Sequence, residues 1–377
     1  MTQPSRFNAL SRHSGFWRSK GALCLLFAAI PLASLVLSPD VVRASDAFQL
    51  TGDEASAVFD KAKAAVVQVR SGDKGLVSAG SGFFIDDQGT VLTSSSIVGD
   101  NTSARVVING VEMDAKILGN DARSGLTMLQ IAYGASPALP LAHASNLQTG
   151  DGVVAIGYPM NLPVASSQGP VCGFDASYLA RLDASTAPKG SVAALERFAT
   201  THIHANVAIS PGQIGGPLLN SHGEVIGLVA TSPDAGRSIY ALPVEAIAKV
   251  MSDFSQYGRA RYGWVGVNVM EEHDAARDGR TVRVVQVMPG APASESGVAV
   301  GDTLMRIDAR EIYRPADVLD ASFFSQIGST MKVVVRRDDK LFTYSFGVIE
   351  RPENPTAPIA SHAAPANHVA DSPQAPR

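Results

Sequence analysis

The sequence predicts a mainly β protein, and the prediction rests on the spacing of apolar runs in the middle of the chain. Between residues 65 and 239 the chain consists of short runs rich in Val and Ile. Gly, Asn-Gly and Asp-Gly signals separate these runs, as at tight turns between strands. This spacing is typical of an all-β barrel or sandwich. At 377 residues, the chain is long enough for two or three domains with their own cores.

The first part of the chain has the pattern of a secretory signal peptide. Basic residues precede an apolar run over residues 21–37, and Ala44 closes a small-residue cleavage site. An uncleaved membrane anchor is the alternative, because the run approaches the ~18 residues that begin to suggest a span. Pro31 and the short length of the run favour cleavage. We therefore expect residues 1–44 to be a signal peptide of a periplasmic protein, with membrane attachment only if this leader is retained.

Charge and cysteine content narrow the possible partners. Without residues 1–44, 26 basic and 34 acidic residues remain, a net charge of −8. Such a chain is not expected to bind nucleic acid, whose phosphates attract basic surfaces. Cys172 is the one cysteine outside the leader, so no internal disulfide is expected. We expect its thiol to be a small buried side chain rather than a reactive nucleophile.

Two helices and a long connection interrupt the strand pattern. Apolar residues recur every three or four positions over residues 54–64, which predicts a short amphipathic helix, and residues 243–251 predict another. Residues 174–201 show few strand signals and exceed the usual connection length, so a loop or local insertion is expected there. The expected strands cover residues 65–70, 82–85, 91–93, 104–108, 128–132, 153–156 and 225–229.

Three stretches resemble the active-site loops of one protease family. They are Gly80-Ser-Gly-Phe-Phe-Ile with the following run to Val98, Asp121-Ala-Arg-Ser-Gly-Leu-Thr-Met-Leu, and Ser210-Pro-Gly-Gln-Ile-Gly-Gly-Pro-Leu-Leu-Asn. Together they resemble the HtrA family of periplasmic serine proteases. The resemblance implies a trypsin-like double β-barrel, which we place at residues 45–251.

The same resemblance shows where the sequence departs from the family. The family has a general-base His, an orienting Asp and a nucleophilic Ser where this chain has Ser96, Gly125 and Ile214. Ile214 has no lone pair for attack, Ser96 does not titrate near neutral pH, and Gly125 has no side chain to orient a base. Loss of nucleophile and base removes on the order of a millionfold in turnover. The sequence therefore predicts a pseudoprotease without catalytic residues.

The nucleophile loop retains glycines that suit an oxyanion-type turn. In the active family, backbone N–H groups at the positions of Gly212 and Ile214 form the oxyanion hole. Here such donors would form a vestigial loop that holds a carboxylate or carbonyl. The alternative is a collapsed loop kept only as scaffold.

Two other chemical interpretations involve nearby polar residues. A displaced catalytic site could combine Ser210 with Asp121 and either His202 or His204, although a triad tolerates little misplacement. If residues 202–204 form a strand, the two imidazoles share a face and could bind a transition metal. Two ligands do not close a metal site, so a solvent-facing pair is expected, and no cofactor is predicted.

A second unit follows, at residues 258–348. Tyr262-Gly-Trp-Val-Gly-Val, Gly290-Ala-Pro-Ala-Ser-Glu-Ser-Gly-Val and Val300-Gly-Asp-Thr-Leu-Met-Arg-Ile-Asp resemble, in order, a PDZ domain of the HtrA type. The resemblance implies an α+β domain in which one loop offers backbone N–H groups to a terminal carboxylate. From residue 349 to 377, the Pro- and Ala-rich composition predicts a disordered tail.

The expected peptide-binding residues lie on the carboxylate loop and on a helix across the groove. The loop glycine gives close backbone approach, and apolar residues at helical spacing suggest a hydrophobic terminal side chain. The alternative for the helix residues is that they only fill the core. The predicted set is Trp264, Val265, Gly266, Val267, Leu319 and Phe323.

These features favour a secreted HtrA-like pseudoprotease that binds peptides or unfolded protein termini as a chaperone, scaffold or regulator in the cell envelope. One alternative is an active serine endopeptidase with a displaced site. Another is a metal-binding envelope scaffold. Phe48 and the first helix lie where the resembled family builds its trimer, so a homo-trimer or assembly with an active relative is expected.

Overall fold

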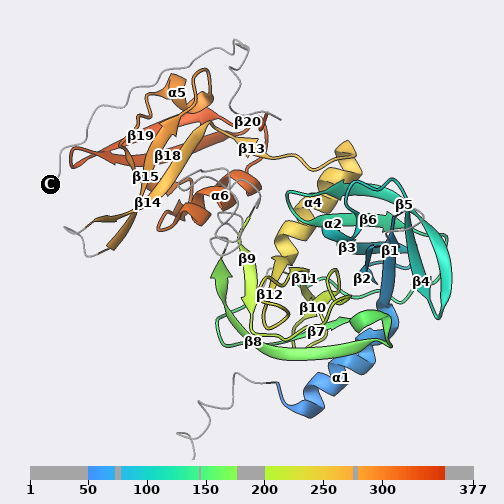
Figure 1. The fold of residues 1–377 in the computed structure, drawn as a ribbon. Coiled ribbons are helices and arrows are strands. Elements are labelled where there is room, and N and C mark those ends of the chain that lie inside the picture. The colour runs from blue at the N-terminus through green and yellow to red at the C-terminus, as the bar shows by residue number, and fades with distance from the viewer. Residues whose placement is uncertain (1–49, 73–77, 144–145, 176–199, 275–278, 353–377) are drawn as a thin grey trace, which may run out of the picture. The chain divides into compact units, whose positions relative to one another are not determined.

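The computed structural model describes residues 50–72, 78–143, 146–175, 200–274 and 279–352 (Figure 1). The expected signal peptide, Phe48 and all but the first residues of the expected tail lie outside these ranges. Two closed β-barrels and a separate PDZ-type sheet make up the described chain, so the expected mainly β class is confirmed. None of the described helices combines the length and the apolar character that a bilayer span requires.

The first barrel closes in the strand order β1-β2-β3-β6-β5-β4. Inward-facing Val69, Phe84, Val91 and Leu129 are almost completely buried in its core. The alternation of inward and outward residues follows from the pleat of a strand. The strands are β1 (Val66–Ser71), β2 (Ser78–Phe84), β3 (Thr90–Ser94), β4 (Ala104–Ile108), β5 (Val111–Asp121) and β6 (Leu126–Gln130).

The second barrel closes in the order β10-β11-β12-β9-β8-β7. Its core contains Ile203, Leu218, Ile226 and Ile239, all buried. The strands are β7 (Gly152–Gly157), β8 (Ala165–Asp175), β9 (His202–Ala205), β10 (Pro217–Leu219), β11 (Val225–Thr231) and β12 (Ile239–Pro243).

Long strands β5 and β8 were not expected from the apolar runs. Strand β5 alternates apolar and polar residues from Val111 to Ile117 but is partly or fully exposed over most of its length, whereas β8 is rich in Ser, Gln and Gly and has no such alternation. Backbone pairing holds them instead: β8 pairs with β7 over residues 152–157. Cys172 lies on β8 and is exposed, which corrects the expectation of a buried thiol. Of the expected 174–201 connection, residues 176–199 lie outside the described structure, and residues 174–175 complete β8.

Both expected helices of the barrel region are present. Helix α1 (Gly52–Ala62) begins with a capping box in which Thr51 and Glu54 exchange hydrogen bonds, and it buries Ala55, Val58 and Ala62. Helix α4 (Val244–Tyr257) runs six residues beyond the expected end, because its apolar face continues to buried Phe254.

The PDZ unit is a sheet in the order β14-β15-β16-β18-β19, with β14 at its edge. Helix α6 (Pro315–Phe324) starts after Arg314, and a short strand β13 (Gly263–Trp264) pairs with β20 (Ile349–Glu350). The pairing of β20 corrects the expected start of the tail at residue 349. The remaining elements are β14 (Val267–Asp274), β15 (Gly279–Val287), α5 (Pro292–Ser296), β16 (Thr303–Ile307), β17 (Arg310–Glu311), β18 (Thr330–Arg337) and β19 (Lys340–Gly347).

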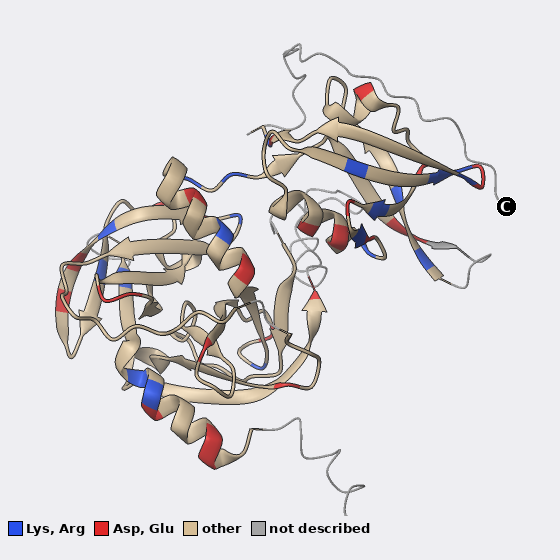
Figure 2. Cartoon of the chain, turned by 180° about the vertical axis from the view of Figure 1, so that it is seen from behind, with Lys and Arg blue, Asp and Glu red and all other residues tan. Residues whose placement is uncertain are grey.

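Charged residues are distributed along both units. Figure 2 shows basic and acidic residues interspersed on the described ribbon. The ion pair between Arg337 and Asp302 is fully buried on its acidic side: Arg337 donates from Nε and Nη2 to the two carboxylate oxygens of Asp302, at 2.6 and 2.8 Å, and Asp302 is 0% exposed. Such bidentate pairs are among the stronger charged interactions in proteins.

Replacing Arg337 by Met should lower the unfolding free energy of the PDZ unit by about 2 kcal/mol, because the buried carboxylate of Asp302 loses its cation. Solvent reduces the cost of leaving this carboxylate unpaired, since the Arg337 side chain is about a third exposed. Urea unfolding measures the change. The matched control is Arg280→Met, which breaks an exposed pair with Glu271 and should cost less than about 0.5 kcal/mol. Equal losses of unfolding free energy in the two variants would contradict a larger contribution from the Arg337–Asp302 pair.

Candidate functional site

The fold brings the three expected triad positions to one region of the barrel domain. A Cβ added to Gly215, next to Ile214, would lie 2.6 Å from Thr93 Oγ1 and 3.0 Å from Ser94 N. The N–H of Ser95 donates to the carbonyl of Gly125 at 2.9 Å. The turn at 214–215, the segment at 93–96 and the turn at 125 therefore form one cluster, as the resemblance implies.

Ser96 lies exposed on the short helix α2 (Ser95–Val98). Its hydroxyl is 2.8 Å from that of Ser94, and Ser94 Oγ also accepts the N–H of Ser96. Ser94 thus acts as the N-cap of this helix. The hydroxyl pair carries no group that accepts a proton near neutral pH.

Gly125 occupies a left-handed turn, with φ of +81°. The N–H of Gly125 donates to the carbonyl of Asp121, and the Asp121 carboxylate accepts the N–H of Ser124 at 2.7 Å. Space is open on the Cβ side, where the nearest atom is Ala230 Cβ at 3.8 Å. The backbone conformation, rather than crowding, is therefore what favours glycine here.

The side chain of Ile214 packs against the cores of both barrels. It is half-buried and contacts the apolar cluster of the first barrel as well as that of the second. At the position where the resembled family has its nucleophile, this chain therefore has an apolar bridge between two cores.

The loop around Ile214 is held by backbone and side-chain hydrogen bonds. Buried Ser81 donates from Oγ to the carbonyl of Gly212 at 2.7 Å, and its N–H donates to the carbonyl of Ile214 at 2.8 Å. Gln213 is buried and accepts the N–H of Ser210 on Oε1 at 2.8 Å. These bonds fix the turn as one structural unit.

The expected oxyanion donors, the N–H groups of Gly212 and Ile214, are oriented by hydrogen bonds to the carbonyls of the preceding residues. The carbonyl of Pro211 accepts the N–H of Met160, and the carbonyl of Gln213 accepts the N–H of Gly216. A trans peptide directs its N–H opposite to its C=O. The N–H groups of Gly212 and Ile214 therefore face the other way, and neither has a hydrogen-bond acceptor among the described residues.

The residues of the expected displaced triad take part in other structural contacts. Ser210 N–H bonds to Gln213, Asp121 caps the turn at Ser124, and His202 Nδ1 lies 3.0 Å from the carbonyl of Thr200. None of the hydrogen bonds recorded for Ser210 and Asp121 leads to an imidazole. This arrangement gives the displaced-site alternative no geometric support.

The two histidines of β9 occupy different environments, so the expectation of a solvent-facing pair is wrong for His202. His202 is 1% exposed, and burial lowers the pKa of its imidazole to about 4, against the raising effect of the Thr200 carbonyl. His204 is partly exposed and stacks on Tyr240, with ring centroids 4.6 Å apart. Within the described ranges, no three His, Cys, Asp or Glu side chains are grouped as metal ligands, so the metal-scaffold alternative gains no support.

In the carboxylate loop of the PDZ unit, around residues 264–267, hydrogen bonds to carbonyls again fix the direction of the neighbouring N–H groups. Ala293 N–H donates to the carbonyl of Val265 at 3.0 Å, and Met288 N–H donates to the carbonyl of Gly266 at 2.8 Å. The N–H groups of Gly266 and Val267 therefore point away from Ala293 and Met288. Gly266 has φ of +81°, and a Cβ there would lie 2.0 Å from Ala291 Cβ. Only glycine fits both the conformation and the space.

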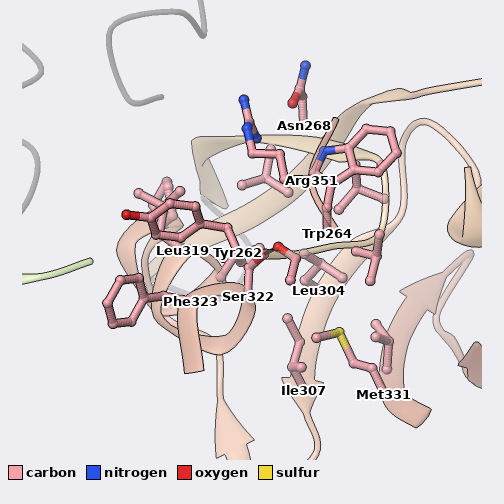
Figure 3. A pocket seen from close by; sticks show the side chains of 18 of the residues that line it. Tyr262, Trp264, Asn268, Leu304, Ile307, Leu319, Ser322, Phe323, Met331 and Arg351 are labelled. Carbon is pink, nitrogen blue, oxygen red and sulfur yellow. Dashed lines mark hydrogen bonds between the residues drawn. The ribbon is translucent and has the colours of Figure 1, made fainter. Parts of the chain in front are cut away.

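An apolar pocket adjoins this loop, and all six predicted peptide-binding residues line it. Figure 3 shows Leu319 and Phe323 on one side and Trp264 on the other. Phe323 is 1% exposed, so it fills the core as well as lining the pocket. Sequence reasoning missed the pocket floor, since its members look like ordinary strand residues: Leu304, Ile307, Met331, Val333 and Phe346.

Acidification should destabilise the barrel domain through His202. The unfolded imidazole binds a proton near pH 6.5, whereas the folded one does so near pH 4. Stability is thus complete above about pH 6.5 and falls as pH drops toward 4, by about 2 kcal/mol between pH 7 and pH 5. His202→Asn retains a donor for the Thr200 carbonyl without titrating, so urea unfolding should show a shallower pH dependence. An unchanged slope in His202→Asn would contradict this origin.

Comparison with known proteins gives two domain matches. Residues 80–228 match the trypsin-like peptidase domain, and residues 263–347 match the PDZ domain. A probable periplasmic serine endoprotease, DegP-like, from Hahella chejuensis is 29% identical over 80% of this chain. The putative serine protease HhoB from Synechocystis is 27% identical over 69% of this chain. The chain spans 64% of the length of each of these relatives.

Solved structures share the fold. The HtrA-type protease AlgW with a tripeptide superposes with a TM-score of 0.65 at 22% identity, covering 80% of this chain and 98% of AlgW. A serine endoprotease from Yersinia pestis gives a TM-score of 0.57 at 23% identity, covering 78% of this chain and 97% of its own. The chain thus combines a region similar to trypsin-like peptidase domains with a region similar to PDZ domains, and the relatives named here carry the names of probable or putative serine proteases.

Proposed function

We propose that this chain is a non-catalytic, HtrA-type peptide-binding protein of the cell envelope. Its PDZ pocket binds the C-termini of peptides or unfolded proteins, and its barrel domain serves as a scaffold. The observation that carries the proposal is the combination of an outward-facing N–H pair at Gly266 and Val267 with an adjoining apolar pocket.

The chemistry of the pocket supports a terminal carboxylate with an apolar last residue. Backbone N–H groups of the loop bind the carboxylate, while β14, as the edge strand, offers its free edge to an added peptide strand. The apolar walls and floor bury the last side chain. The solved HtrA-type protease AlgW was obtained with peptides, which fits the same mode of recognition.

The barrel site supports the non-catalytic part of the proposal. Attack on a peptide carbonyl requires a nucleophile and a base that removes its proton. Ile214 supplies neither, the Ser94–Ser96 pair has no imidazole in its recorded contacts, and His202 is a buried group bonded elsewhere. An active endopeptidase would need a site other than this one. The relatives carry the names of probable or putative serine proteases, so an active endopeptidase is the second candidate function.

Location and assembly remain predictions. Periplasmic location accords with the leader pattern and with the names of two of the bacterial relatives. A homo-trimer, or assembly with an active relative, follows from the resemblance and is measurable by light scattering of the secreted chain.

Titration should detect peptide binding through Trp264, the one tryptophan outside the predicted leader. A peptide with an apolar last residue and a free carboxylate should change its fluorescence with a Kd of about 1–100 μM, and amidation should weaken binding at least about tenfold. Gly266→Val should abolish the response, because its side chain would overlap Ala291. Equal binding of free and amidated peptides would refute carboxylate recognition. The control is Val300→Ala, an exposed site outside the pocket.

Restoring a serine at position 214 should destabilise the chain without activating it. Ile214→Ser removes apolar contacts with both barrel cores and should cost about 2 kcal/mol of unfolding free energy. The wild type and this variant should neither degrade unfolded casein nor react with a fluorophosphonate probe. Labelling of a serine in the wild type, accompanied by inhibitor-sensitive cleavage, would overturn the non-catalytic proposal.

A further inference from the structure

The peptide pocket has two walls that are tied together at one point. Strand β13 and the following loop form one wall, and helix α6 forms the other. The hydroxyl of Ser322 on α6 donates to the carbonyl of Gly263 on β13 at 2.5 Å. This bond therefore crosses from wall to wall.

The helix and the strand also approach closely at the same place. A Cβ added to Gly263 would lie 2.8 Å from the carbonyl oxygen of Ser322 and 3.2 Å from Ser325 Cβ. With no side chain at Gly263, the backbone of β13 lies directly against the last turn of α6. The separation of the walls is thus set by a backbone contact and by one hydroxyl.

Ser322 differs in character from the rest of the α6 face that lines the pocket. Pro315, Val318, Leu319, Ser322 and Phe323 form this face, and Ser322 is its polar member. In Figure 3, Ser322 lies between the helix residues and the Trp264 side of the pocket. A serine in or next to a helix often bonds to a carbonyl of the preceding turn, as the C-cap residue Ser325 of α6 does with Ala321. The hydroxyl of Ser322 instead donates to the carbonyl of Gly263 on the opposite wall.

The tie lies at the carboxylate end of the pocket. Gly263 and Trp264 form β13, and the carboxylate loop follows directly at Val265 and Gly266. A bound peptide places its last side chain beside this loop. The distance between α6 and β13 therefore limits the size of the last side chain that fits.

We propose that Ser322 is a positioning residue that holds the carboxylate end of the pocket at a fixed width and thereby selects the size of the ligand's last side chain. The inference rests on the proposed peptide-binding function and extends it from recognition of a terminus to selection among termini. The ligand class is a peptide with a free carboxylate whose last residue is aliphatic and of limited size, in preference to an aromatic one.

The test compares labelled peptides that differ only in a last residue of Ala, Val, Leu or Phe, by fluorescence anisotropy with the two-domain secreted chain. In Ser322→Ala, the preference for Val or Leu over Phe should fall by about fivefold, the effect expected when one hydrogen bond no longer restrains the wall. Ser322→Thr keeps a hydroxyl and should retain the wild-type order. Ser325→Ala removes a bond between the C-cap residue and the last turn of α6, keeps the Cβ that faces Gly263, and is the matched control, with an unchanged order.

The outcomes separate the two proposals. Wild-type binding with a uniform loss across all four peptides in Ser322→Ala, or with no change, overturns the role of Ser322 and leaves peptide binding intact. The absence of wild-type binding to any free-carboxylate peptide counts against the proposed function itself and removes the basis of this inference. A size shift in Ser325→Ala equal to that in Ser322→Ala also overturns it, because helix stability would then explain both.

Discussion

The planar trans peptide is the constraint on which both sites of this chain depend. In the barrel loop and in the PDZ loop, a carbonyl is fixed by a hydrogen bond to a neighbouring segment, so the N–H of the same peptide must face the opposite direction. The donors that could receive an oxygen-bearing ligand are thus oriented by bonds made elsewhere. Neither loop needs a charged side chain to present them.

The two loops differ in what adjoins their donors. Beside Gly266 and Val267 lies an apolar pocket with walls, a floor and room for a side chain. Beside Gly212, the side chain of Ile214 lies against the cores of both barrels. The PDZ loop thus adjoins a pocket that a ligand side chain can enter, whereas at the barrel loop the side chain of Ile214 fills the adjoining space. In the proposed function, the PDZ unit binds the ligand, and the side chain at position 214 contributes packing between the two barrels.

Much of this arrangement could be predicted from the sequence, because motifs with strict geometry leave strong patterns. The Gly-rich turns at 212–216 and 266 and the Val-rich barrel strands belong to that group. Strand β8 could not be predicted, since its segment lacks an apolar alternation and is held by pairing with β7 and β9 more than by buried side chains of its own. Because β8 was not predicted, the exposed position of Cys172 on this strand was not predicted either. The tie between Ser322 and Gly263 joins residues far apart in sequence, and nothing in either local pattern marks it.

The left-handed backbone at Gly125 limits which residues position 125 can hold without strain. An acidic residue returned to that position would meet a conformation that side chains other than glycine adopt at a cost of about 1–3 kcal/mol. A serine at position 214 would meanwhile lose the packing of Ile214 against the cores of both barrels. If the proposed non-catalytic function holds, substitutions at positions 125 and 214 toward the residues of the resembled family would therefore first lower the stability of the barrel domain.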